Sequence, residues 1–179
     1  MSWIGAIIVA AVCGPGAEPM TMTLTSEAFA GGAPIPKQYT VEGQDLSPPL
    51  AWDNVPANCQ ELALVCDDPD APSKEPWVHW VIYKIPTDVR QLPTGVPVVA
   101  RPQTPAGVLQ GHNSWTSGST IGYRGPAPPP GHGVHHYHFR LYALDMKLPL
   151  AEGVDRAALA KAMTGHILAE AELIGTFQR

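Results

Sequence analysis

Residues 78–85 read VHWVIYKI and, together with residues 137–144, YHFRLYAL, form the two longest candidate strands in the chain. In both stretches apolar side chains occupy odd and even positions alike. Because side chains alternate between the two faces of a strand, this pattern predicts interior strands that are covered on both sides. Coverage on both sides requires a second layer, so the sequence predicts a two-layer β architecture.

Shorter candidate strands lie at residues 22–26 and 62–66. Proline and glycine break the chain between strands, and they predict loops over residues 31–36, 43–49, 69–76 and 122–133. The last loop contains three consecutive prolines, residues 128–130, which lack backbone donors and cannot lie inside a sheet. We expect this segment to hold one extended, exposed shape.

A helix is predicted after Asp155, which can cap it. Apolar residues then recur at intervals of four, at Leu159, Met163 and Ile167. Gly175 supplies a stop signal, and Thr164-Gly165 can divide the helix into two pieces. Strands and helix together predict a mostly β fold, a β-sandwich with short peripheral helices and a C-terminal helix.

The length of 179 residues predicts a single domain, and a hydrophobic content of 45% is enough to build its core. The net charge is −5, and Lys and Arg form no cluster, which argues against nucleic acid as a partner. The three cysteines are an odd number without the spacing of a zinc site. The composition therefore excludes a disulfide scaffold.

The first residues of the chain need a separate interpretation. Residues 3–12 form an apolar run that is too short to cross a bilayer. No Lys or Arg precedes the run, and Val12 is a poor residue before a cleavage site. We interpret residues 1–21 as an N-terminal extension or the result of an upstream start codon, and residues 22–179 as the domain. This favours a cytoplasmic protein without an integral membrane span, and the alternative is export through residues 1–19.

Acidic and histidine side chains gather in three places: residues 67–72 (DDPDAP), His79, and residues 135–138 (HHYH). The acidic segment follows an apolar strand on a proline-stiffened turn, and it is either a functional site or a solvated Asx turn. His79 interrupts an apolar strand, where an unpaired ring nitrogen costs roughly 1–3 kcal/mol, so its ring is satisfied structurally or belongs to a site. Alternation places His135 and Tyr137 on one face of their strand.

Several motifs in a fixed order resemble the phosphatidylethanolamine-binding protein family, and especially its bacterial Raf-kinase-inhibitor-like branch of the YbhB/YbcL type. The resemblance covers residues 22–177. The motifs are DPDAP at 68–72, HW at 79–80, GYRGP at 122–126, PP at 128–129, HHY at 135–137 and FRLYALD at 139–145. Residues 116–120 depart from the pattern, because this loop is longer than in typical relatives, and the departure puts the rim of the site in doubt.

The resemblance implies a sandwich of antiparallel sheets with a small cavity for phosphate-like anions, including phospholipid headgroups in animal relatives. Carried over position by position, the cavity residues are Asp68, Asp70, His79, Gly125, Pro126, His135 and Tyr137. We expect phosphate or phosphoethanolamine as the ligand, no cofactor and no bound metal. The resemblance also suggests a kinase or a protease as protein partner. It allows a homodimer, for which the sequence shows no diagnostic stripe.

We expect the carboxylates to accept hydrogen bonds from the rings of His79 and His135, which favours imidazolium, so that binding strengthens as the pH falls. Tyr137 adds a hydroxyl donor, and the backbone at Gly125 approaches the ligand closely. The competing class is a metal- or His/Asp-dependent hydrolase, since two Asp and two His can hold a metal or run acid–base catalysis. GxSxG and HExxH motifs are absent, which favours a binding protein over an enzyme.

Overall fold

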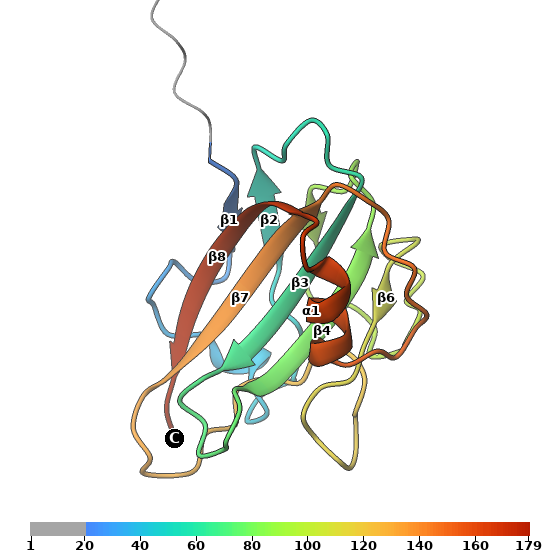
Figure 1. Cartoon of the computed structure of the whole chain (residues 1–179). Helices are drawn as coiled ribbons and strands as arrows, with labels where there is room; N and C mark the ends of the chain where they lie inside the picture. The colour runs from blue at the N-terminus through green and yellow to red at the C-terminus, as the bar shows by residue number, and fades with distance from the viewer. Residues whose placement is uncertain (1–20) are drawn as a thin grey trace, which may run out of the picture.

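Strands β3 (Glu61–Asp68) and β4 (Trp77–Ile85) form the centre of the fold in the computed structural model, which describes residues 21–179 (Figure 1). They pair antiparallel, and β7 (His135–Leu144) pairs antiparallel with the other edge of β3. Within the described residues these strands belong to a five-stranded sheet with the order β6-β4-β3-β7-β8. At each end of this sheet, strand ends that are far apart in the sequence lie close together.

The smaller sheet contains β1 (Thr23–Thr25), β2 (Leu50–Asp53) and β5 (Gln91–Leu92) in the order β1-β2-β5. The other elements of the described chain are the 3-10 helix η1 (Lys37–Tyr39), β6 (Leu109–Gln110), α1 (Arg156–Met163) and β8 (Ile167–Phe177). All strand pairings inside both sheets are antiparallel, so the predicted antiparallel β-sandwich is confirmed. The extension predicted before β1 lies, apart from Thr21, outside the described residues.

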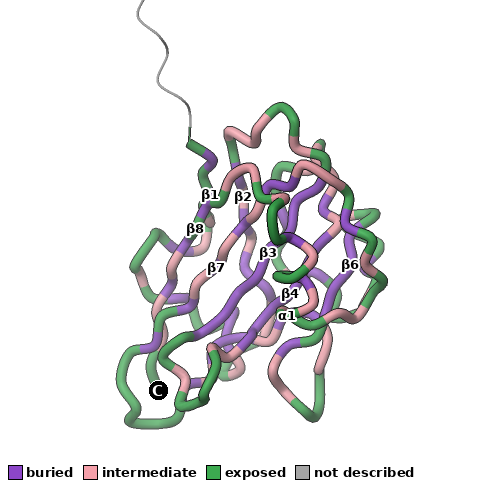
Figure 2. The backbone as a smooth tube through the Cα atoms, viewed as in Figure 1, coloured by how far each residue is buried: buried purple, intermediate pink, exposed green. Residues whose placement is uncertain are grey.

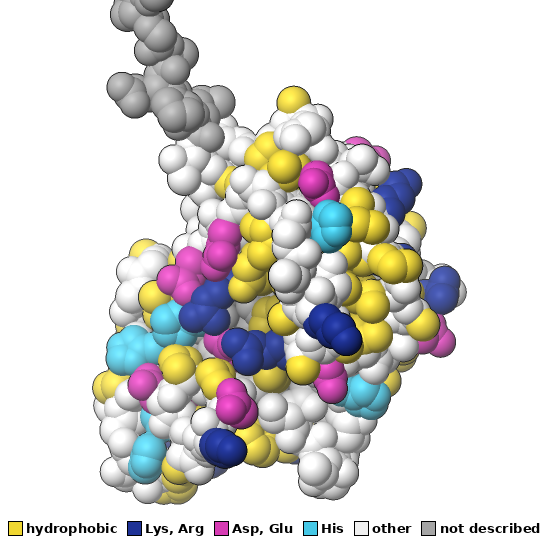
Figure 3. Space-filling model, viewed as in Figure 1, with side chains coloured by type: hydrophobic (Ala, Val, Ile, Leu, Met, Phe, Trp, Pro, Cys, Tyr) yellow, Lys and Arg dark blue, Asp and Glu magenta, His cyan; other side chains and the backbone are white. Residues whose placement is uncertain are grey.

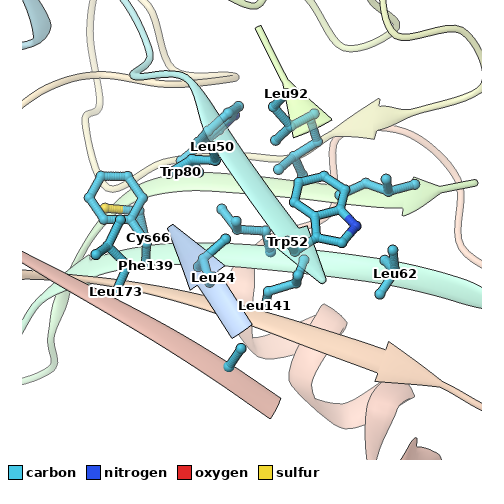
Figure 4. Packing of buried hydrophobic residues seen from close by; sticks show 14 of the residues in the cluster. Leu24, Leu50, Trp52, Leu62, Cys66, Trp80, Leu92, Phe139, Leu141 and Leu173 are labelled. Carbon is cyan, nitrogen blue, oxygen red and sulfur yellow. The ribbon is translucent and has the colours of Figure 1, made fainter. Parts of the chain in front are cut away.

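The main hydrophobic core lies between the two sheets (Figure 4). The smaller sheet contributes Leu24 and Trp52, and the larger sheet contributes Cys66, Trp80 and Phe139. Each of these side chains is at most 5% exposed. Removal of a large apolar side chain from water is worth about 1.5–3 kcal/mol, so the contact between the sheets supplies much of the stability of the fold.

A second apolar cluster covers the opposite face of β3 and β4. Val65, Val81 and Tyr83 pack there against Leu159 and Met163 of α1. Both strands are therefore buried along almost their whole length (Figure 2). The prediction of an interior strand covered on both sides is confirmed for β4.

The same prediction is wrong for most of β7, where residues on one face are buried and those on the other are exposed or half-buried. The outer face carries His136, His138 and Arg140, and Figure 3 shows acidic, basic and histidine side chains side by side in this region. The Arg140 guanidinium lies 2.7 Å from Asp67 and 2.9 Å from Glu172. Ion pairs thus occupy the outer face of β7, whereas α1 covers β3 and β4.

The predicted helix after Asp155 is shorter than the sequence pattern suggested. The Asp155 carboxylate accepts a hydrogen bond from the Ala158 N–H at 2.8 Å, but α1 ends at Met163. Gly165 adopts a φ of +81°, a left-handed conformation that stops a helix, and β8 follows as a strand paired with β7. Residues 170–173 alternate between exposed glutamates and buried side chains, and this period of two marks the strand.

We predict that Gly175→Ala destabilises the fold by about 1–3 kcal/mol, because an added methyl group overpacks the core. A Cβ at this position would lie 2.5 Å from Cγ1 of Ile35 and 2.8 Å from Cε2 of Phe29. The measurement is the free energy of unfolding in urea. Gly31→Ala is the matched control, since its nearest neighbour, Cδ1 of Leu173, would lie 3.9 Å away. Equal stability of the two variants would contradict the packing described for β8.

Candidate functional site

A cavity of about 200 Å³ lies at the end of the larger sheet where β3 ends and where β4 and β7 begin. Antiparallel pairing brings these three strand ends together. The lining residues are Asp68, Ala71, Pro72, Ser73, Trp77, His79, Trp115, Ala127, Pro128, Pro129 and His135. The volume is below the roughly 300–1,000 Å³ of sites for drug-sized ligands, so the cavity suits a small group.

A buried pair of Asp68 and His135 forms the polar part of this cavity. The Asp68 carboxylate accepts a hydrogen bond from Nδ1 of His135 at 2.7 Å, and the two side chains are 4% and 1% exposed. The other carboxylate oxygen accepts the Asp70 backbone N–H at 2.9 Å. Because Asp68 fixes the proton on Nδ1, only Nε2 of His135 remains for another partner. That nitrogen lies 2.8 Å from Nδ1 of His132.

His79 is held differently from the way we expected. Its Nδ1 donates to the backbone carbonyl of Arg124 at 2.6 Å, and no aspartate accepts from it within the described chain. Burial lowers the pKa of His79, although the Arg124 carbonyl and the Asp68 carboxylate act to raise it. The ring is therefore neutral at physiological pH, and the expectation that it is an imidazolium is wrong for the ligand-free protein.

Tyr137 lies on the same face of β7 as His135, and its ring packs edge-on against His79 with centroids 5.0 Å apart. Its hydroxyl is buried, and no residue from 21 to 179 forms a hydrogen bond with it. Burial raises the pKa of Tyr137 strongly, and the nearby Asp68 carboxylate raises it further. The hydroxyl therefore keeps its proton and remains available as a donor.

Four of the predicted cavity residues do not line the cavity: Tyr137, whose ring packs behind that of His79, and three others. Asp70 is exposed, and its carboxylate accepts hydrogen bonds from the backbone N–H and from Nδ1 of His136, at 2.8 Å and 2.7 Å. The Gly125 N–H donates to Asp45 at 2.7 Å, so it is not free for a ligand. The carbonyl of Pro126 accepts from a backbone N–H at 3.3 Å.

Gly125 has a packing role instead. A Cβ at this position would collide with the backbone oxygen of Tyr39 and would lie 2.8 Å from Cα of Thr40. Glycine is therefore required because another stretch of backbone passes closely, and not because a ligand does.

Aromatic and proline residues that sequence reasoning missed form the apolar wall of the cavity. Trp77 and Trp115 meet edge to face with centroids 5.4 Å apart, and Trp115 also contacts the ring of His79 at 5.0 Å. Arg124 lies 4.8 Å from the centre of the Trp115 ring and donates to the carbonyl of Ser117 at 2.8 Å. Trp115 immediately precedes loop 116–120, which is longer than in typical relatives. This difference in length pointed to the rim of the cavity but did not predict that an aromatic side chain forms it.

The proline segment on the other side of the cavity is tied down by Arg179. The Arg179 guanidinium donates to the carbonyl of Pro128 at 2.6 Å, and its own carbonyl accepts the N–H of Gly131 at 3.0 Å. This segment lies outside the strands, so no sheet ladder provides a donor for the Pro128 carbonyl, and the arginine supplies one. The wall formed by residues 127–129 is thus anchored.

Two features are absent from residues 21–179. No cluster of three or more His, Cys, Asp or Glu side chains within residues 21–179 is arranged to hold a metal ion. None of the helices described here has the length and apolar character needed to cross a membrane.

Comparison with known proteins places this geometry in context. Residues 25–178 match the sequence profile of the family described as phosphatidylethanolamine-binding protein. The chain is 50% identical over 158 residues to a UPF0098 protein of Methanothermobacter thermautotrophicus, a match that covers 88% of this chain and 99% of the other.

Two crystal structures are similar along nearly their whole length. A phosphatidylethanolamine-binding protein homologue from Chlamydia trachomatis is 39% identical, with a TM-score of 0.78 over 89% of this chain and 98% of the other. Escherichia coli YbcL, described as a member of the mammalian PEBP family, is 28% identical, with a TM-score of 0.79 over 89% and 99%.

We predict that acid destabilises the wild-type protein more than a His79→Gln variant. The pKa of His79 is lowered in the folded state, so the unfolded chain binds more protons once the pH falls below about 6.5, and stability is lost towards the folded pKa. Glutamine cannot take up this proton. Urea unfolding of both proteins at about pH 7 and about pH 5 should differ in pH dependence by on the order of 1 kcal/mol. Parallel losses in the two proteins would show that the ring does not titrate in this way.

Proposed function

The chain belongs to the phosphatidylethanolamine-binding protein family, and from this we propose that its cavity binds a small anion such as phosphate or a phosphoester headgroup. The observation that carries the proposal is the buried Asp68–His135 pair inside a small cavity. When Nε2 of His135 also carries a proton, the pair is neutral as a whole and presents an N–H donor. An anion then accepts a charge-assisted hydrogen bond from this buried pair.

The arrangement removes an apparent conflict between carboxylates and an anion. Two like charges about 4 Å apart cost roughly 4 kcal/mol at an effective dielectric of 20. Asp70 lies outside the cavity and pairs with His136, so it does not add to this cost. Asp68 faces His135, whose imidazolium charge would offset it. Tyr137 does not line the cavity, but its buried hydroxyl has no hydrogen-bond partner among residues 21–179 and keeps its proton because its pKa is raised, so it can donate to a ligand that reaches past the ring of His79.

His79 favours a ligand that also carries a hydrogen. Its Nδ1 is the donor to Arg124, so the neutral ring offers an acceptor at Nε2. A protonated phosphate oxygen or an ammonium group can donate to an acceptor, whereas a fully deprotonated anion cannot. The apolar wall of Trp77, Trp115 and the prolines suits an organic substituent rather than a second charge. These features support a phosphoester such as phosphoethanolamine.

We propose binding rather than hydrolysis. Ser73 lines the cavity, but its hydroxyl donates to the carbonyl of Glu75 at 2.7 Å rather than to a histidine. Ser114 accepts the N–H of Val78 at 2.8 Å. Neither serine has the base partner that activates a nucleophile.

Regulation of a kinase or a protease is a further use of the same site that we propose. Its specific support is the exposed Pro129-Pro130 segment, which borders the cavity and follows the carbonyls that Arg179 holds. A segment that is already rigid loses little conformational entropy when a protein partner binds.

We predict that His135→Gln weakens binding of phosphate and phosphoethanolamine by roughly 10- to 150-fold, the value of a hydrogen bond to a charged group. Glutamine retains an amide donor for Asp68 but cannot become positively charged. Isothermal calorimetry measures the affinity, and circular dichroism verifies the fold. His136→Gln is the matched control, because His136 is exposed and pairs with Asp70 on the outer face. Equal weakening in both variants, or in neither, would argue against the cavity as the binding site.

We also predict that an anion binds together with a proton, because Asp68 holds Nδ1 of His135 and Nε2 offers a donor only when it is also protonated. Binding that is coupled to proton uptake strengthens as the pH falls, and the comparison is made at about pH 8 and about pH 6. Sulfate is the probe, since its own charge is constant over this range. Calorimetry in two buffers with different ionisation enthalpies counts the protons. Sulfate affinity that is constant or lower at the acidic pH, without proton uptake, would refute the imidazolium.

A further inference from the structure

His132 lies in the exposed loop between the prolines and β7, and its ring reaches back to the buried pair. Its Nδ1 is 2.8 Å from Nε2 of His135, and the two ring centroids are 5.0 Å apart. Sequence patterns did not assign this residue to a site, because it stands alone between two glycines.

This contact involves the ring nitrogen of His135 that is available to a ligand. Nδ1 of His135 donates to the Asp68 carboxylate at 2.7 Å, so only Nε2 can bind a ligand. A separation of 2.8 Å is also the distance at which an anionic oxygen would accept a hydrogen bond from an imidazolium. In the ligand-free protein the imidazole of His132 therefore stands where such an oxygen would stand.

We propose that His132 is a specificity-determining residue that occupies the anion position in the free protein and must leave when the anion binds. This inference rests on the proposed function of the cavity. His132 then acts as an internal competitor, and the cavity admits those ligands that form a better bond with His135 than the imidazole does.

The loop has the properties that such a displacement requires. Gly131 and Gly133 flank His132 with φ values of +75° and +95°, and no atom lies within 4 Å of a Cβ built on either glycine. The backbone of His132 is tied to the loop by its N–H, which donates to the carbonyl of Pro129 at 3.1 Å. His135, by contrast, is fixed in a strand paired with both β3 and β8. The Gly131 N–H remains bonded to the Arg179 carbonyl, so a movement of the His132 side chain with the residues after Gly131 frees Nε2 without disturbing the sheet.

The competition favours charged ligands over neutral ones. In the free protein Nε2 of the neutral His135 accepts from the Nδ1–H of His132, and an alcohol or an amide that donates to the same nitrogen offers a bond no better than the imidazole already provides. An anionic oxygen, which accepts from Nε2 once His135 is an imidazolium, forms a charge-assisted bond that is roughly twice as strong. Displacement of His132 therefore filters for anions, which the shape of the small cavity alone does not do.

The test compares inorganic phosphate binding to the wild-type protein, His132→Ala and His112→Ala by isothermal calorimetry. His112 is the matched control, an exposed loop histidine whose Nδ1 donates to the carbonyl of Thr120 at 3.1 Å. Loss of the competing hydrogen bond should tighten phosphate binding about fivefold in His132→Ala and leave it unchanged in His112→Ala. Nitrogen-15 spectra of the wild-type rings should show the His132 ring released as phosphate is added.

The remaining outcomes distinguish the role of His132 from the proposed function of the cavity. Suppose that His135→Gln abolishes phosphate binding but His132→Ala binds phosphate no more tightly than the wild-type protein. The anion site would then stand, and His132 would not be a competitor. Weaker binding by His132→Ala would identify His132 as a ligand contact. Failure of phosphate to bind to the wild-type protein and to His132→Ala alike would overturn the proposed function together with this role. Binding by His132→Ala alone would support the competitor in its strongest form.

Discussion

The buried hydrogen bond between Asp68 and His135 is the constraint on which the rest of the cavity depends. Removal of two ionisable groups from water is costly, and the cost is offset only if both are well paired. The pair uses one nitrogen of the imidazole and orients the other. The neutral ring of His79, which is buried, and the half-buried Trp77 and Trp115 of the apolar wall then decide what can approach that nitrogen.

The sheet makes this pair possible by alternation and by strand order. Successive side chains of β3 point to opposite faces, so Asp67 joins the ion pairs around Arg140 while Asp68 reaches the cavity. The same rule separates His135 from His136 on β7. The end of β3 thus contributes one carboxylate to the ion pairs on the surface and the next to the buried cavity. A shift of one residue in the register of the strand would exchange the faces of these two side chains.

Sequence patterns predicted the strands β3 and β4 and the shared face of His135 and Tyr137, because these depend on local periodicity. The pattern at Ile167 misled, since apolar spacing of four competed with the alternation of Glu170 and Glu172 that the sheet selects. Hydrogen bonds between residues far apart in the sequence could not be predicted from local patterns. The bond from Gly125 to Asp45 spans 80 positions, and nothing local distinguished the roles of Asp68 and Asp70.

The decisive experiment is a crystal structure of the protein with bound phosphate. We expect phosphate in the cavity with an oxygen at hydrogen-bond distance from Nε2 of His135, while Asp68 still accepts from Nδ1. Phosphate bound elsewhere, with the cavity unchanged and the histidine making no contact to it, would show that the Asp68–His135 pair does not bind the anion.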